Sequence, residues 1–170
     1  MSTATDLLAD HFERIRETVR QTTGGLTPEQ LTHRVDAESN TIAWLIWHLT
    51  RVQDDHIADV MGAEQIWATK GWADAFGLPF DASATGYGQT PDEVAAVQGV
   101  TAEELIGYHE DVAARTLDYV RGLSDDDLAR IVDENWVPPV TLAVRLVSVI
   151  GDDLQHVGQA GFIRGIVERR

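Results

Sequence analysis

The chain contains no cysteine among its 170 residues. This absence excludes disulfides, thiolate metal ligands, iron–sulfur clusters and a cysteine nucleophile. Any thiol chemistry must therefore use a thiol that arrives as a substrate. Lysine is almost as scarce, because Lys70 is the only one and the remaining basic residues are arginines.

Positive charge is in short supply overall. The chain has 13 basic against 28 acidic residues, which gives a formal net charge of −15. A uniformly acidic surface repels phosphate backbones and anionic membrane surfaces, so neither nucleic-acid nor membrane binding is expected. No stretch approaches the roughly 18 apolar residues of a membrane span. The N-terminal segment carries acids where a secretion signal needs bases and an apolar core, so we expect a cytoplasmic protein.

Several well-known catalytic signatures are also missing. The sequence has no HExxH zinc motif, no GxSxG nucleophile motif, no phosphate-binding P-loop and no GxGxxG dinucleotide motif. Its length fits one domain, and a hydrophobic content of 44% is typical of a globular protein. We therefore predict a single domain that spans residues 1–170.

Four segments place apolar residues at helical spacing. They cover approximately residues 5–22, 41–61, 102–121 and 141–168. Gly24 and Gly25 end the first segment, Asn40 is suited to cap the second, and Thr101 with Glu104 forms a capping box for the third. No segment shows the strict alternation of a half-buried strand. The pattern predicts an all-α fold with a four-helix bundle, an architecture that commonly hosts metal sites between facing helices.

The connection between the second and third helices, residues 62–99, is far longer than usual. It contains five aromatic residues, which are too many for a solvated linker: Trp67, Trp72, Phe76, Phe80 and Tyr87. We predict an ordered loop that folds over one end of the bundle. Its aromatic residues, together with the tryptophans of the second helix, would equally suit a homodimer interface.

Three residues are candidates for a metal site. Asp152 and His156 are four residues apart on the fourth helix, so their side chains lie on one face, and His48 on the second helix could complete the set. Two imidazoles and one carboxylate leave coordination positions open, as catalytic metal sites do. The alternative is an ordinary hydrogen-bonded pair of Asp152 and His156, with His48 satisfied separately.

Two further residues are candidates for contact with a substrate or a metal ligand. Gln159 follows His156 by three residues and could face the site, or could equally be a polar edge residue. Arg51 lies one turn after His48 and could neutralise an anionic substrate, although a surface ion pair is the more common use of such an arginine.

Two titratable residues close to the candidate ligands are expected to lie outside the site. His56 is about 12 Å beyond His48 along the helix axis and cannot bind the same ion. Because Asp55 precedes it, we expect His56 on a solvated acidic face. Asp153 points about 100° away from Asp152, so we expect it to face solvent or to support the site indirectly.

Two stretches, WHLTRVQDDH in the second helix and DDLQHVGQAGFIRG in the fourth, resemble the DinB-like superfamily. These helical bundles include bacillithiol and mycothiol transferases and mycothiol-dependent maleylpyruvate isomerase, and the resemblance covers essentially the whole chain. It implies an up-down-down-up four-helix bundle, with the long connection between helices 2 and 3. It also implies a divalent ion held by three side chains, which by position are His48, Asp152 and His156.

The carboxylate at position 152 departs from the common pattern. Many members of the superfamily have His where this chain has Asp152, and the isomerase has Glu. Because Asp is one methylene shorter than Glu, it would draw the ion closer to the fourth helix. Zinc is the first expectation for the ion, with nickel, iron or manganese as alternatives.

The resemblance implies a metal-dependent transferase or isomerase that uses a low-molecular-weight thiol of the mycothiol type and a small electrophilic substrate. Three alternatives remain open. In a metal-dependent hydrolase, the open position would hold water. Two histidines and a carboxylate also suit an iron oxygenase. A non-enzymatic stress-response module would keep the ion without turnover. No residue is assigned as a general base.

Overall fold

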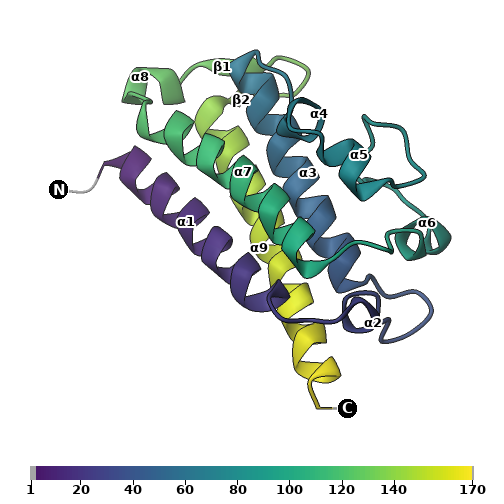
Figure 1. Cartoon of the computed structure of the whole chain (residues 1–170). Helices are drawn as coiled ribbons and strands as arrows, with labels where there is room; N and C mark the ends of the chain where they lie inside the picture. The colour runs from purple at the N-terminus through teal and green to yellow at the C-terminus, as the bar shows by residue number, and fades with distance from the viewer. Residues whose placement is uncertain (1–2, 170) are drawn as a thin grey trace.

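The computed structural model describes residues 3–169, and its framework is four long helices (Figure 1). These are α1 (Ala4–Thr23), α3 (Ile42–Met61), α7 (Ala102–Arg121) and α9 (Leu142–Val167). α1 and α9 run in one direction, and α3 and α7 run in the opposite direction (Figure 1). The all-α, up-down-down-up bundle is therefore confirmed. Each long helix begins and ends within one residue of its predicted position.

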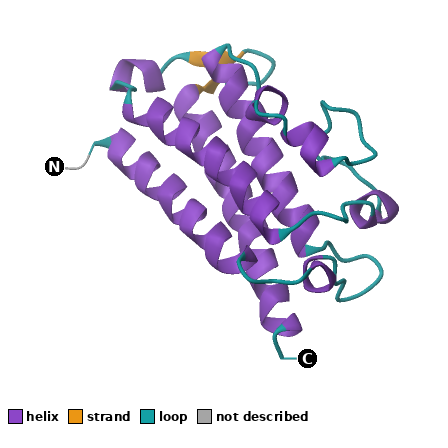
Figure 2. Cartoon of the chain, viewed as in Figure 1, coloured by secondary structure: helices purple, strands orange, loops and turns teal. Residues whose placement is uncertain are grey.

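Shorter elements connect the long helices (Figure 2). They are α2 (Pro28–Leu31), α4 (Ile66–Thr69), α5 (Trp72–Phe76), α6 (Pro91–Ala95) and α8 (Asp125–Leu128), followed by β1 (Ile131–Asp133) and β2 (Val140–Thr141). The two strands pair antiparallel between α8 and α9. Sequence reasoning missed this hairpin, because strands of three and two residues are too short to show an alternating pattern.

Local capping explains where the helices begin and end. Thr41 caps α3, since its Oγ1 accepts a hydrogen bond from the Trp44 N–H at 3.0 Å; the expectation that Asn40 caps this helix was wrong by one residue. The predicted capping box of Thr101 and Glu104 is present at the start of α7. Gly24 ends α1 as expected.

The α3 helix is buried on nearly all sides. In the bundle it packs against α7 and α9, while α1 packs against the same two helices. Every residue of α3 from Ile42 to Arg51 is buried, including Trp44 and Trp47. A helix that is buried on nearly all sides needs a cover on its outer side as well. No helix among residues 3–169 is long and apolar enough to cross a membrane.

That cover is residues 62–99, which contain α4, α5 and α6. This segment lies along the outer side of α3 and α7 (Figure 1), so the prediction that it folds over one end of the bundle was wrong. Trp67 and Phe76 are buried there against Tyr108 of α7, with ring centroids 5.1 and 5.9 Å from the tyrosine ring. Two of the segment's aromatic residues therefore belong to the chain's own core, whereas Tyr87 is exposed. A homodimer stays a prediction.

One buried carboxylate fixes the start of this segment. Asp54 of α3 accepts hydrogen bonds from the backbone N–H groups of Ile66 and Trp67, at 2.9 and 2.8 Å, in the first turn of α4. It also accepts from the Tyr108 hydroxyl at 2.9 Å and from Nη2 of Arg115 at 2.5 Å. A buried charge is tolerated only when it is paired and hydrogen-bonded. Asp54 meets that condition by tying α4 and α7 to α3.

Replacing this carboxylate should weaken the fold strongly. Asp54→Ala leaves two N–H groups, a hydroxyl and a guanidinium without their acceptor, and we expect a loss of about 3–5 kcal/mol in the free energy of unfolding. Urea denaturation followed by circular dichroism measures it. Asp118→Ala, at an exposed position on α7, is the control and should change stability by less than about 0.5 kcal/mol. Equal effects of both changes would contradict the assigned role of Asp54.

A second buried carboxyl has no such partners. Asp153 of α9 is fully buried, and neither of its oxygens has a hydrogen-bond partner among the described residues. Burial, and secondarily the neighbouring charge of Asp152, raises the pKa of Asp153 well above its usual range. Of the two roles expected for Asp153, the one in which it faces solvent was wrong, because α9 packs against α1 as well as α3 and so buries two of its faces. Asp153 therefore stays protonated to a higher pH than an ordinary aspartate does.

A neutral buried carboxyl makes stability depend on pH. In the unfolded chain this carboxyl ionises near pH 4, whereas the folded chain keeps it protonated, so folding stability falls as the pH rises above 4 until the native pKa is reached. Asparagine has the same shape and stays neutral. We expect Asp153→Asn to match the wild type near pH 4 and to gain about 1.4 kcal/mol over it per pH unit above that.

Chemical denaturation of both proteins between pH 4 and pH 8 measures this difference. A stability difference that does not change with pH would show that Asp153 titrates alike in the folded and the unfolded chain. That result would contradict a neutral buried carboxyl.

Candidate metal centre

α3 and α9 bring the three predicted ligands together. His48 comes from α3, and Asp152 and His156 come from successive turns of α9. One potential ligand atom from each residue lies within 4.8 Å of the other two. The ring centroids of His48 and His156 are 4.7 Å apart. The spacing argument for α9 and the expectation that His48 faces it therefore agree with the geometry.

Backbone carbonyls determine which nitrogen of each ring is free. Nδ1 of His48 lies 2.5 Å from the Thr85 carbonyl oxygen, and Nδ1 of His156 lies 3.0 Å from the Asp152 carbonyl oxygen. Because a carbonyl oxygen only accepts, each Nδ1 carries the proton and donates. Each Nε2 then has an unshared electron pair. Histidines that bind metals typically show this arrangement, in which the other ring nitrogen donates to a fixed acceptor.

The carboxylate of Asp152 completes the set of unpaired atoms. Its Oδ2 is buried and has no hydrogen-bond partner among residues 3–169. His156 bonds the backbone oxygen of Asp152 and not its carboxylate, so the alternative of an ordinary hydrogen-bonded pair is not realised. An orphaned buried oxygen is costly unless something binds it. One carboxylate oxygen and two imidazole nitrogens fit a divalent cation such as zinc, nickel, iron or manganese.

Electrostatics favour the neutral form of His48, which is the form that binds a metal ion. Burial lowers the pKa of His48, and the neighbouring His156 lowers it further, against the opposing effects of the Thr85 carbonyl and Asp152. The ring is therefore neutral at neutral pH, as a metal-binding imidazole must be.

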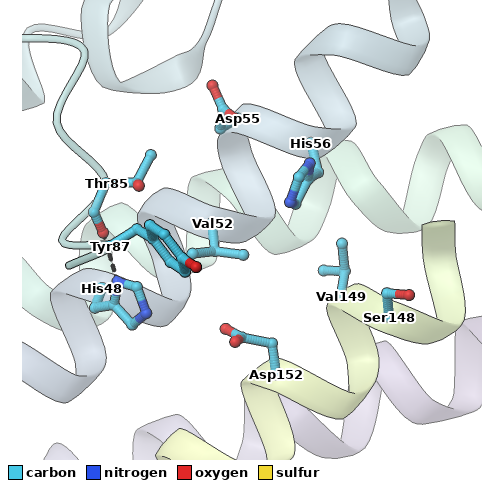
Figure 3. Close-up of a pocket in the computed structure, with 9 residues that line it drawn as sticks. All are labelled: His48, Val52, Asp55, His56, Thr85, Tyr87, Ser148, Val149 and Asp152. Carbon is cyan, nitrogen blue, oxygen red and sulfur yellow. Dashed lines mark hydrogen bonds between the residues drawn. The ribbon is translucent and has the colours of Figure 1, made fainter. Parts of the chain in front are cut away.

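A cavity of about 420 Å³ opens beside these residues, between α3 and α9 (Figure 3). Its walls are formed by His48, Val52, Asp55, His56, Thr85, Tyr87, Ser148, Val149 and Asp152. This volume falls in the range of small-molecule sites. Asp55 and His56, which were expected on a solvated acidic face, are half-buried and line this cavity. His56 is eight residues after His48, and this helical spacing was the signal that both share one face.

The chain has counterparts among known proteins. A family model described as "MST: Mycothiol-S-transferase" matches residues 7–168. The chain belongs to the mycothiol-S-transferase family. This is a DinB-like family, so the resemblance found in the sequence is confirmed.

The structural comparison finds the same fold in a solved protein. One solved structure, described as the crystal structure of the conserved protein of locus from Enterococcus faecalis, superposes on this chain with a TM-score of 0.92. It is 28% identical, and the match covers 100% of both chains. No curated protein matches this member of the mycothiol-S-transferase family.

In this family member, the last part of the 62–99 segment supports His48. Trp44 stacks on the His48 ring at 4.5 Å, and its Nε1 donates to Oε1 of Gln89 at 2.7 Å. Gly86 passes so close that an added Cβ would lie 2.7 Å from Nδ1 of His48 and 3.0 Å from the Trp47 ring. Its φ of +95° also favours glycine. Sequence reasoning missed Thr85 and Gly86 because their contribution depends on the path of an aperiodic segment.

Arg51 binds a neighbouring part of the same segment. Its side chain is fully buried, and it donates to the Ala84 carbonyl at 3.0 Å, the Ala82 carbonyl at 3.1 Å and Oε1 of Gln65 at 2.7 Å. These bonds fix the residues directly before Thr85. Arg51 is not among the residues that line the cavity. The structure therefore gives it a positioning role in place of the predicted contact with a substrate.

Gln159 lies apart from the three ligands. It lines a separate cavity of about 500 Å³ together with Val35, Asn40 and Phe162, and its side chain is exposed. The structure does not bring it to the cavity beside Asp152. A helical step of three residues changes the facing direction by about 60°, and this change separates Gln159 from His156.

Adding one methyl group at Gly86 should disturb the metal centre without altering any ligand. Gly86→Ala pushes Thr85 away from His48, and we expect metal affinity to fall by about 10–100-fold, as it does when a supporting hydrogen bond is lost. A competition titration with a chromophoric chelator measures this. Gly88→Ala is the matched control, because Gly88 also has a positive φ of +73° but has open space around it. Equal losses in both variants would attribute the effect to backbone strain and contradict the contact with His48.

Proposed function

We propose that this protein is a metal-dependent transferase that joins a low-molecular-weight thiol of the mycothiol type to a small electrophile. The observation that carries the proposal is the set of three unpaired ligand atoms beside a cavity, in a chain of the mycothiol-S-transferase family. Because the chain has no cysteine, the thiol must enter as a substrate. Zinc is the first expectation for the ion, and the cytoplasm is the expected location.

The ion and the protein residues would have separate roles in the reaction. His48, Asp152 and His156 would hold a divalent ion, which would act as a Lewis acid and lower the pKa of a bound thiol, so that the nucleophilic thiolate would be available at neutral pH. In the transfer, the thiol proton leaves to solvent, sulfur bonds to the electrophilic carbon, and the leaving group departs with its bonding electrons.

The chain's own residues organise this site. The carbonyls of Thr85 and Asp152 fix the two imidazoles, so each Nε2 keeps its direction. Trp44 covers one face of His48 and excludes water there. The cavity between α3 and α9 leaves room for the electrophile beside the thiol.

Metal content tests the site first. We expect tag-free protein purified without chelator to carry a stoichiometric transition metal, and His48→Ala and His156→Ala to lose it while circular dichroism shows the fold intact. His11→Ala is the matched control, because His11 is an exposed histidine on α1, away from the three ligands. If the wild type contains no metal and takes up neither zinc, nickel, iron nor manganese, the proposed function is wrong.

Thiol transfer then tests the reaction. Mycothiol and bacillithiol are each offered with monochlorobimane, and fluorescence reports the conjugate. We expect metal-dependent conjugation with mycothiol that falls to the uncatalysed rate in His48→Ala and persists in His11→Ala. Thiol-independent turnover of an ester would favour a hydrolase instead, and tight thiol binding without product would favour a non-enzymatic module.

A further inference from the structure

The cavity contains a third histidine that the proposed metal centre does not use. His56 lies two turns beyond His48 on α3, and its ring points into the space between α3 and α9 (Figure 3). Its Nδ1 is 3.1 Å from Nη1 of Arg145. A guanidinium has donors only, so Nδ1 of His56 accepts. In the neutral ring the proton must then sit on Nε2, which is the opposite tautomer to that of His48 and His156.

Arg145 is itself firmly placed. Its Nη2 donates to Oδ2 of Asp133 at 3.2 Å, its Nη1 lies 3.7 Å from Oδ2 of Asp59, and its side chain is only 14% exposed. Burial, and secondarily the charge of Arg145, lowers the pKa of His56, which favours the neutral ring. Asp133 of the β1–β2 hairpin thus fixes the position of Arg145, and the hydrogen bond from Arg145 fixes the orientation of the His56 ring. The Nε2–H group of His56 is therefore an N–H donor with a fixed direction in the cavity.

Acceptors lie at the same end of the cavity. Oδ1 of Asp55 accepts from Nε2 of Gln65 at 2.7 Å, and within residues 3–169 its Oδ2 has no protein donor. The Ser148 hydroxyl donates to the Val144 carbonyl at 2.9 Å, so its oxygen can still accept. A donor beside acceptors matches a hydroxyl group, which donates one hydrogen bond and accepts others.

The charges near this end of the cavity further restrict which ligand groups can bind there. Asp59 and Asp133 both pair with the guanidinium of Arg145, which contacts His56. Asp55 adds a third carboxylate in the wall of the cavity. A ligand carboxylate placed there would face a net negative field, and such like-charge contacts suppress binding. The acceptable ligand group is therefore an uncharged one that carries hydroxyls.

We propose that His56 and Asp55 form a hydroxyl-binding subsite that takes the uncharged sugar end of the thiol substrate while its sulfur lies at His48, Asp152 and His156. This inference rests on the proposed function and specifies which part of the thiol substrate the cavity recognises. The two ends are separated by two turns of α3, about 12 Å along its axis, which suits a cysteine-derived thiol linked to a sugar.

The tautomer of His56 is measured independently of activity. Two-bond proton–nitrogen correlation spectra of histidine-labelled protein show which ring nitrogen is protonated, and the spectrum of His56→Gln identifies the signals of His56. We expect Nε2–H at neutral pH with Nδ1 as an acceptor. A proton on Nδ1, or rapid exchange between the two tautomers, would overturn the fixed donor and with it the subsite.

Calorimetric titration of zinc-loaded protein tests the ligand. Mycothiol carries an uncharged glucosamine–inositol end, N-acetylcysteine, used as its uncharged amide, has the same thiol without the sugar, and bacillithiol carries carboxylates beyond its sugar. We expect mycothiol to bind tighter than either. His56→Phe keeps the ring shape without a donor and should weaken mycothiol about tenfold while leaving N-acetylcysteine unchanged. His56→Gln keeps an N–H near the Nε2 position and should restore most of that affinity.

The outcomes separate this inference from the proposed function. If N-acetylcysteine binds but mycothiol binds no tighter, or keeps its advantage in His56→Phe, the subsite is wrong and the thiol function stands. If bacillithiol binds as tightly as mycothiol, the charge argument fails and the uncharged specificity is overturned. If none of the thiols binds the wild type, both the proposed function and the subsite are overturned.

Discussion

A buried pair of charged residues on α3, Asp54 and Arg51, determines where the long connecting segment lies. Asp54 binds the first turn of α4 at the beginning of residues 62–99, and Arg51 binds the carbonyls of Ala82 and Ala84 further along. The two charges lie 3.8 Å apart with no solvent exposure. Buried ion pairs are seldom a net source of stability, but they fix one arrangement of the chain because any other leaves a charge unpaired. Here they fix the cover of the bundle.

The candidate metal centre depends on this arrangement although neither residue touches it. Thr85 follows directly after the residues that Arg51 binds, and its carbonyl sets the tautomer of His48. The candidate ligands on α9 need no such help, because His156 donates to a carbonyl of its own helix. The site therefore has one half that is formed within a single helix and one half that requires the tertiary structure.

This division explains how much of the molecule could be predicted. Helical periodicity gave the four long helices, and the four-residue step from Asp152 to His156 placed two ligands on one face; both are local features. His48 was a candidate third ligand from the sequence alone, and the resemblance to a family supported that assignment by position. The contributions of Thr85, Gly86 and Arg51 could not be predicted, because they depend on how an aperiodic segment returns to α3. Asp153 shows a related limit, since an angle around one helix does not say which neighbours surround it.

The support of His48 by a backbone carbonyl has a consequence for how this site tolerates sequence change. Every amino acid carries a carbonyl, so residue 85 can vary widely without loss of the hydrogen bond to Nδ1. The next position has no such freedom, because any side chain at Gly86 would collide with His48 and Trp47. Among homologues that keep this geometry, we therefore expect position 86 to be conserved as glycine, although Gly86 makes no hydrogen bond to His48.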